Sequence, residues 1–256
     1  MTQFSANLGF LWTELSLPDA IHAAADAGFV AVECHWPYET SAEMVREALL
    51  QTGLPMLGIN TARGQEGEFG FSALPERQDD ARQAIDEAIG YARRIDAHAI
   101  HVMAGFASGA EAHATFVANL RYAASAAAAH GITILIEPLN PHDAPGYFLN
   151  STDQAEAILR EVARDNIKLM FDCYHVARTE GDVLDRLTRL FPLIGHIQIA
   201  SVPDRGEPGC GDLDYRAVFT LLETLGWTTP IGAEYKPAAA TQDGLAWMRD
   251  LQPLDA

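Results

Sequence analysis

Short apolar runs alternate with longer amphipathic stretches along the whole chain. The apolar runs are rich in β-branched and aliphatic residues, as in Ile132–Ile136, which is typical of strands that are covered on both faces. We predict eight strands from them: Phe4–Leu8, Phe29–Glu33, Pro55–Asn60, Ala99–Met103, Thr133–Glu137, Lys168–Asp172, Ile194–Gln198 and Pro230–Glu234.

The amphipathic stretches between these runs predict a helix after each strand. Pro18 and Ser151 suit the starts of helices, and Gly53 and Gly226 stand where a left-handed residue commonly ends one. The predicted helices are Leu17–Ala27, Ala42–Thr52, Glu76–Ile95, Ala110–His130, Thr152–Ala163, Asp182–Leu190, Tyr215–Leu225 and one near Gln242–Asp250.

Strand–helix alternation repeated eight times predicts an α/β fold with a parallel sheet inside a layer of helices. The length of 256 residues and the number of strands favour a single (β/α)8 TIM barrel over 1–256. A doubly wound open sheet is the alternative, but no GxGxxG follows the first strand. No linker or change of composition divides the chain, so we expect one domain with its active site at the C-terminal ends of the strands.

The charge balance narrows the classes of partner. With 17 basic and 35 acidic residues the formal charge is −18, which argues against nucleic acid as a partner. Cys34, Cys173 and Cys210 are widely spaced, so we expect neither disulfides nor a thiolate zinc site, and a cytoplasmic location. The N-terminal segment lacks a basic region typical of a signal peptide, and no apolar run is long enough to span a membrane. The sequence leaves open whether the protein forms a homo-oligomer.

Polar residues end four consecutive predicted strands: Glu137, Asp172, Gln198 and Glu234. A single carboxylate after a strand is as often a solvated residue at a loop edge, but four in succession are harder to explain in that way. Neighbouring strands lie roughly 5 Å apart, so side chains at equal heights can converge. We therefore predict that these four residues bind one divalent metal ion.

The ligand types indicate which ion to expect. Three carboxylates that converge without a cation raise one another's pKa values, and a divalent ion relieves that conflict. Oxygen ligands without a thiolate favour Mg²⁺ or Mn²⁺, with Co²⁺ open, over zinc. Beside such an ion, Glu137 and Glu234 are expected to act as a base and acid pair. They would move a proton between neighbouring carbons of a small hydroxy-carbonyl acid through a metal-stabilised enediolate.

Six motifs together resemble the hydroxypyruvate isomerase family of the xylose-isomerase-like barrels, and the resemblance runs over essentially the whole chain. Its most specific element is the run after the seventh predicted strand, "QIASVPDRGEPGCG". The motifs are "ECHWPY" (Glu33–Tyr38), "HVMAG" (His101–Gly105), "EPLN" (Glu137–Asn140), "FDCYH" (Phe171–His175), the segment His196–Tyr215 and "EYKP" (Glu234–Pro237).

The resemblance implies a role for each matching residue. Glu137 and Glu234 correspond to the family's proton-transferring glutamates and, with Asp172 and Gln198, to its metal ligands. His175 corresponds to a histidine that contacts substrate, and Arg205 to an arginine near the substrate oxygens. The family interconverts hydroxypyruvate and tartronate semialdehyde, and some relatives act on four-carbon 2-oxo acids.

The sequence also offers weaker candidate residues and alternative functions. Lys236 and His35 are weaker candidates for binding substrate, and His196 lies two residues before Gln198 on the same strand face. A ketose or keto-acid 3-epimerase would use the same glutamate pair. A DNA repair nuclease would need a histidine-rich zinc cluster and a basic face, and a binding protein without activity would not need both glutamates.

Overall fold

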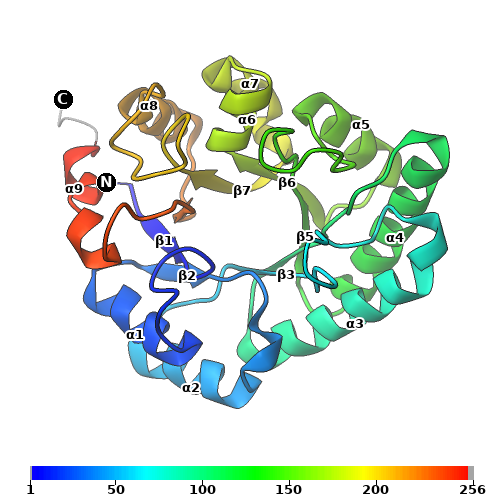
Figure 1. The fold of residues 1–256 in the computed structure, drawn as a ribbon, viewed down its shortest axis with the longest axis horizontal. Coiled ribbons are helices and arrows are strands. Elements are labelled where there is room, and N and C mark those ends of the chain that lie inside the picture. Colours follow the sequence, from blue (N-terminus) through cyan, green and yellow to red (C-terminus); the bar gives the residue numbers. More distant parts are fainter. Residues whose placement is uncertain (1, 253–256) are drawn as a thin grey trace.

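Eight parallel strands form the centre of the computed structural model, which describes residues 2–252 (Figure 1). The sheet runs in the order β2-β1-β8-β7-β6-β5-β4-β3. Parallel pairing of Val32 with Met56 joins the two ends, and Cys34 N–H donates to Gly58 O at 3.1 Å. The predicted barrel is thus confirmed. Its strands are β1 (Phe4–Asn7), β2 (Ala31–Glu33), β3 (Gly58–Asn60), β4 (Ala99–His101), β5 (Thr133–Ile136), β6 (Ile167–Asp172), β7 (Ile194–Ile199) and β8 (Ile231–Ala233).

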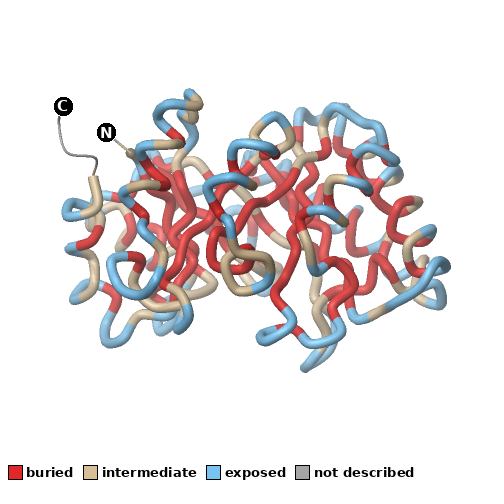
Figure 2. Tube along the Cα trace, turned by 90° about the horizontal axis from the view of Figure 1, so that it is seen from above, coloured by how far each residue is buried: buried red, intermediate tan, exposed pale blue. Residues whose placement is uncertain are grey.

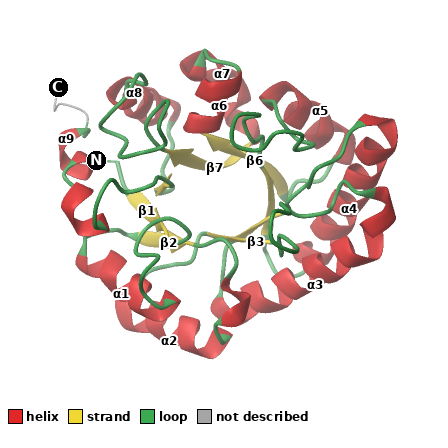
Figure 3. Cartoon of the chain, viewed as in Figure 1, coloured by secondary structure: helices red, strands yellow, loops and turns green. Residues whose placement is uncertain are grey.

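Helices surround these strands as an outer ring (Figure 3). The longer helices bury an apolar stripe against the barrel and expose their other face, so the buried segments follow the strands and parts of the helices (Figure 2). None of the helices in residues 2–252 is long and apolar enough to cross a membrane. The helices are α1 (Leu17–Asp26), α2 (Ala42–Thr52), α3 (Gln78–Ile95), α4 (Gly109–Ala128), α5 (Thr152–Val162), α6 (Cys173–Thr179), α7 (Val183–Leu190), α8 (Tyr215–Leu225) and α9 (Trp247–Asp250).

Two of the helices and the bounds of several strands differ from the predicted elements. Helix α6 was not predicted: it begins directly after β6, and its first four residues are all buried, so it lacks the amphipathic pattern that marks the other helices. The last predicted helix is instead a 3-10 turn, Thr241–Gly244, followed by the short α9. Several strands are shorter than predicted because apolar residues continue beyond the sheet pairing.

The register of the sheet sets the strand ends level with one another. Asn7 pairs with Glu33, Asn60 with His101, and Asp172 with Gln198. Paired residues in adjacent strands point to the same side of the sheet. Because all strands are parallel, these residues gather at one end of the barrel, together with Glu137 directly after β5 and Glu234 directly after β8.

Candidate active site

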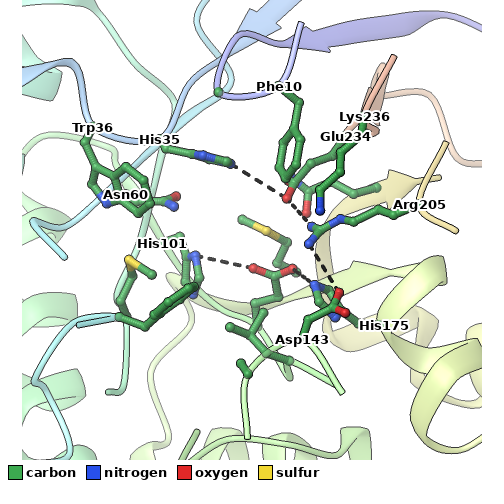
Figure 4. Close-up of a pocket in the computed structure, with 18 residues that line it drawn as sticks. Phe10, His35, Trp36, Asn60, His101, Asp143, His175, Arg205, Glu234 and Lys236 are labelled. Carbon is green, nitrogen blue, oxygen red and sulfur yellow. Dashed lines mark hydrogen bonds and ion pairs between the residues drawn. The ribbon is translucent and has the colours of Figure 1, made fainter. Parts of the chain in front are cut away.

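The polar strand ends surround a cavity of about 410 Å³ at the C-terminal end of the barrel (Figure 4). Asp172 is buried below the lining residues, with 1% of its surface exposed. All the other predicted site residues line the cavity: His35, Glu137, His175, Gln198, Arg205, Glu234 and Lys236. The fold therefore brings every one of the sequence-predicted site residues together at this end of the barrel.

Glu234, directly after β8, is held as a carboxylate by donors from three parts of the barrel. Asn7 Nδ2 and Gln198 Nε2 donate to its Oε2 at 2.8 and 2.5 Å, and Arg205 Nη2 donates to its Oε1 at 2.6 Å. Burial by itself raises the pKa of Glu234, but His35 and the charge of Arg205 outweigh burial and lower that pKa to about 2. The side chain is therefore negatively charged and fixed in orientation.

Glu137 and Asp172 each keep one buried oxygen free. Asp172 Oδ1 accepts the N–H of Tyr174 at 2.8 Å at the start of α6, whereas Asp172 Oδ2 and Glu137 Oε1 have no hydrogen-bond partner within residues 2–252. Burial, reinforced by the charge of Glu234, raises the pKa of Glu137 well above its usual value. Burial also raises the pKa of Asp172 to about 7, against the opposing charge of Arg205.

The amide of Gln198 has one orientation that satisfies its neighbours. Its Nε2 faces two carboxylates, Glu234 Oε2 at 2.5 Å and Glu33 Oε2 at 3.4 Å, and carboxylates accept hydrogen bonds only. Gln198 Oε1 is left buried and unpartnered in the described part of the chain. His196 Nε2 donates to Glu33 Oε2 at 2.6 Å, and Glu33 raises the pKa of His196 although burial opposes this. Glu33 and His196 thus hold the Gln198 amide in place.

The free atoms of these residues fit a divalent cation. Glu137 Oε1, Asp172 Oδ2 and Gln198 Oε1 are all buried acceptor oxygens without partners in the described structure, and buried polar groups of that kind are rare in folded proteins. Possible ligand atoms of Glu137, Asp172 and His175 lie within 4.8 Å of one another. An oxygen-rich site that carries negative charge suits Mg²⁺ or Mn²⁺.

The ring of His175 is oriented by Asn140. Backbone N–H groups of His142 and Asp143 donate to Asn140 Oδ1 at 3.0 and 2.9 Å, which fixes the Asn140 amide. Both the Asn140 backbone N–H and its Nδ2 then face His175 Nδ1, at 3.0 and 2.7 Å. His175 Nδ1 is therefore an acceptor. Burial lowers the pKa of His175 to about 3, so the neutral ring carries its proton on Nε2.

This tautomer decides what His175 can do. Its Nε2 lies 3.6 Å from Asp172 Oδ2 and 3.8 Å from Glu137 Oε1, beyond hydrogen-bond distance. A protonated nitrogen cannot ligate a metal. His175 therefore offers a free N–H to the cavity, which suits contact with a substrate oxygen.

Arg205 lies in the loop after β7 and is fixed on all sides. Its backbone has a left-handed conformation, with φ 57°, and its carbonyl accepts the N–H of Lys236 at 2.7 Å. The guanidinium lies over the rings of Phe10 and Tyr174, 4.7 and 5.1 Å from their centroids. It balances part of the negative charge in the cavity.

The two weaker candidates also face the cavity. His35 Nε2 lies 3.7 Å from Glu234 Oε1, and its ring packs so closely on Gly9 that a Cβ there would lie 2.2 Å from His35 Nδ1. Lys236 is exposed at the cavity rim. Neither residue forms a hydrogen bond or ion pair with Glu137 in the described part of the chain.

Five further polar residues that line the cavity or hold its side chains were not among the predicted site residues: Asn7, Glu33, Asn60, His101 and Asn140. The first four are the last residues of β1 to β4, so the rule that found Glu137 and Asp172 also applies to them. Two were obscured because the strands were predicted to continue past them, to Leu8 and Met103. Asn140 lies in a loop, and no sequence signal connects it to His175.

A family model described as "Xylose isomerase-like TIM barrel" matches residues 21–251. The chain belongs to this family. The crystal structure of a protein described as an AP endonuclease, family 2, from Brucella melitensis is 36% identical and superimposes with a TM-score of 0.94, covering 98% of this chain and 100% of that one.

The names of the curated relatives fall within one group of enzymes. The 2-oxo-tetronate isomerase of Cupriavidus necator is 47% identical over 97% of this chain and 98% of its own length. The hydroxypyruvate isomerase of Escherichia coli is 38% identical over 97% and 98%. The resemblance to the hydroxypyruvate isomerase family is thereby confirmed, and so is the prediction that the chain is an isomerase.

Proposed function

We propose that this isomerase interconverts a small 2-oxo acid and its isomer by moving a proton between neighbouring carbons. The observation that carries the proposal is the set of buried oxygens on Glu137, Asp172 and Gln198 that have no hydrogen-bond partner in the described chain. Beside them lies Glu234, whose carboxylate accepts three hydrogen bonds. The names of relatives at 47% and 38% identity support three- and four-carbon 2-oxo acids, hydroxypyruvate and 2-oxo-tetronate, as substrates.

The proposed proton path uses the two glutamates. One of Glu137 and Glu234 removes the proton from C3 of the 2-oxo acid, and the electron pair of that C–H bond forms the double bond between C2 and C3. The other glutamate delivers a proton to C2. The C3 hydroxyl loses its proton and becomes the new carbonyl, while the former C2 carbonyl oxygen gains a proton and becomes a hydroxyl. Hydroxypyruvate becomes tartronate semialdehyde in this way, and no atom is gained or lost.

The remaining side chains bind and orient the substrate. His175 Nε2–H donates to a substrate oxygen near the reacting carbons. Arg205 and Lys236 attract the carboxylate, and a guanidinium suits such a partner. His35 lies against Glu234 and closes that side of the cavity.

A divalent ion, Mg²⁺ or Mn²⁺, fits the oxygens of Glu137, Asp172, Gln198 and Glu234. When bound, it supplies positive charge that favours the negative charge developing as the proton is removed. His35 and Arg205 keep Glu234 ionised. Gln198 donates from Nε2 to Glu33 and Glu234, which leaves its Oε1 without a partner in the described chain.

The test is proton NMR of the Mg²⁺-loaded protein with each acid in D₂O. We expect conversion to the isomer, with deuterium at the carbon that receives the proton. Return of the four-carbon acid with deuterium and inverted configuration at C3, its stereogenic carbon, would instead identify the 3-epimerase alternative. Absence of any conversion of both acids would contradict the proposed function.

A nuclease activity, suggested by the description of the Brucella melitensis protein, has less support here. The formal charge of −18 opposes binding to a polyanion. The group of side chains among residues 2–252 that could hold a metal ion contains one histidine and two carboxylates. A nuclease of this kind would instead need a histidine-rich zinc cluster.

A further inference from the structure

The two sides of the active-site cavity differ in charge. Arg205, Lys236 and Glu234 lie on one side, and Trp36, Asn60 and His101 lie on the other (Figure 4). The residues of β3 and β4 that line the cavity in the described structure, Asn60 and His101, include no carboxylate, lysine or arginine. One half of the cavity is thus ionic and the other is neutral and polar.

The neutral side holds polar atoms that the protein does not satisfy. Trp36 Nε1 and His101 Nε2 are buried and have no hydrogen-bond partner within residues 2–252. His101 Nδ1 lies 3.5 Å from Glu137 Oε2, and the other ring nitrogen, Nε2, is a hydrogen-bond donor or acceptor according to the tautomer of the ring. The side-chain amide of Asn60 makes no hydrogen bond to described residues, although it lines the same cavity. An indole N–H, an imidazole nitrogen and a side-chain amide on this side of the cavity are therefore without protein partners in the described structure and suit a neutral polar group of a ligand.

The chemistry of the two proposed substrates says which group this is. In a four-carbon 2-oxo acid the reacting carbons, C2 and C3, lie between the C1 carboxylate and the C4 hydroxymethyl group. These two groups therefore leave the reacting carbons in opposite directions. With the carboxylate on the side of Arg205 and Lys236, the hydroxymethyl group points toward Trp36, Asn60 and His101. A three-carbon acid has only hydrogen at that position.

We propose that Trp36, Asn60 and His101 form a subsite for the terminal hydroxymethyl group of a four-carbon 2-oxo acid, and that this acid is the preferred substrate. The inference rests on the proposed function and adds the chain length to it. A hydroxyl both donates and accepts, so it can accept from Trp36 Nε1–H and form further hydrogen bonds with the Asn60 amide and His101 Nε2.

The test compares two substrates in one variant. Asn60→Leu keeps the branched shape of the side chain and removes its hydrogen-bonding groups, and Asn60 touches none of the proposed metal ligands in a described contact. We expect kcat/KM to fall about tenfold for the four-carbon acid and less than about twofold for the three-carbon acid, because one hydrogen bond is lost only in the first case. An equal fall for both acids would overturn the subsite.

Lys236→Met is the matched control at the opposite end of the cavity. Both acids carry the carboxylate, so the ratio of their kcat/KM values should stay at the wild-type value in this variant. A change in that ratio as large as the one in Asn60→Leu would contradict the assignment of the two ends.

A binding measurement separates this inference from the proposed reaction. Threonate and glycerate are four- and three-carbon acids without an oxo group, so neither undergoes the reaction. We expect the Mg²⁺-loaded protein to bind threonate more tightly than glycerate by calorimetry, and Asn60→Leu to remove most of the difference. Equal affinities in the wild-type protein would overturn the subsite even if isomerisation occurs. Selective threonate binding without turnover of either acid would retain the subsite and remove the proposed reaction.

Discussion

The backbone N–H of Asn140 donates to Nδ1 of His175 at 3.0 Å, and this contact determines the tautomer of the histidine. A backbone N–H is always a donor, so Nδ1 must accept. The proton of the neutral ring lies on Nε2, which faces Glu137 and Asp172 without bonding to either. A histidine beside two carboxylates is therefore placed as a donor and not as a metal ligand.

Replacing His175 by Leu should separate these two roles. We expect kcat to fall on the order of 100-fold, as when one donor to a developing negative charge is lost. The Mn²⁺ affinity, measured by calorimetry, should stay within about threefold because metal ligands are unaffected. In His175→Gln, which retains an N–H donor, part of the activity should return. A large loss of Mn²⁺ affinity in both variants would show that His175 is a ligand.

The two glutamates should each be essential for proton transfer. We expect Glu137→Gln and Glu234→Gln to lower kcat by about a thousandfold or more, since an amide cannot exchange the proton. Glu137→Gln should not lower the melting temperature of the metal-free protein, because it removes a buried charge that neighbouring carboxylates repel. Turnover near the wild-type rate in either variant would contradict the proposed proton path.

Two glycines in strands offer a matched pair that tests the packing behind Gln198. A Cβ at Gly232 would lie 2.2 Å from Glu33 Oε1 and 2.8 Å from Gln198 Cγ, whereas a Cβ at Gly58 meets only Ala99 O at 3.7 Å. We expect Gly232→Ala to destabilise the fold by about 1–3 kcal/mol and to weaken Mn²⁺ binding about tenfold or more. Gly58→Ala should leave Mn²⁺ binding unchanged. Equal Mn²⁺ affinities in the two variants would show that the packing does not support the site.

Metal binding should depend on pH. Asp172 has a pKa of about 7 without metal, and the pKa of Glu137 is also raised, so both carboxyls hold protons at lower pH. A cation must displace those protons, so its affinity should rise with pH by up to about tenfold per unit for each proton released. We expect the Mn²⁺-induced increase in melting temperature to grow from pH 5 to about pH 7 and then to level off. An increase that is the same at pH 5 and pH 8 would contradict this expectation.

Much of the site could be predicted because position along a strand carries chemical information. The polar residues Glu137, Asp172, Gln198 and Glu234 each follow an apolar run, and in a parallel barrel the ends of such runs meet. Helix α6 could not be predicted in the same way, because its buried residues show no helical period. The contribution of Asn60 was missed because the next strand was predicted to end at the apolar Met103, so Asn60 did not belong to the run of consecutive polar strand ends.

The sequence by itself determined the barrel, the end of the barrel that carries the chemistry and the residues gathered there. These follow from local periodicity and from the geometry that all parallel strands share. Only the tertiary structure decided how those residues are set: which nitrogen of His175 is protonated, which way the Gln198 amide points, and which half of the cavity is neutral. Each depends on contacts between residues far apart in the chain, such as Glu33 with Gln198, and closure of the barrel creates them.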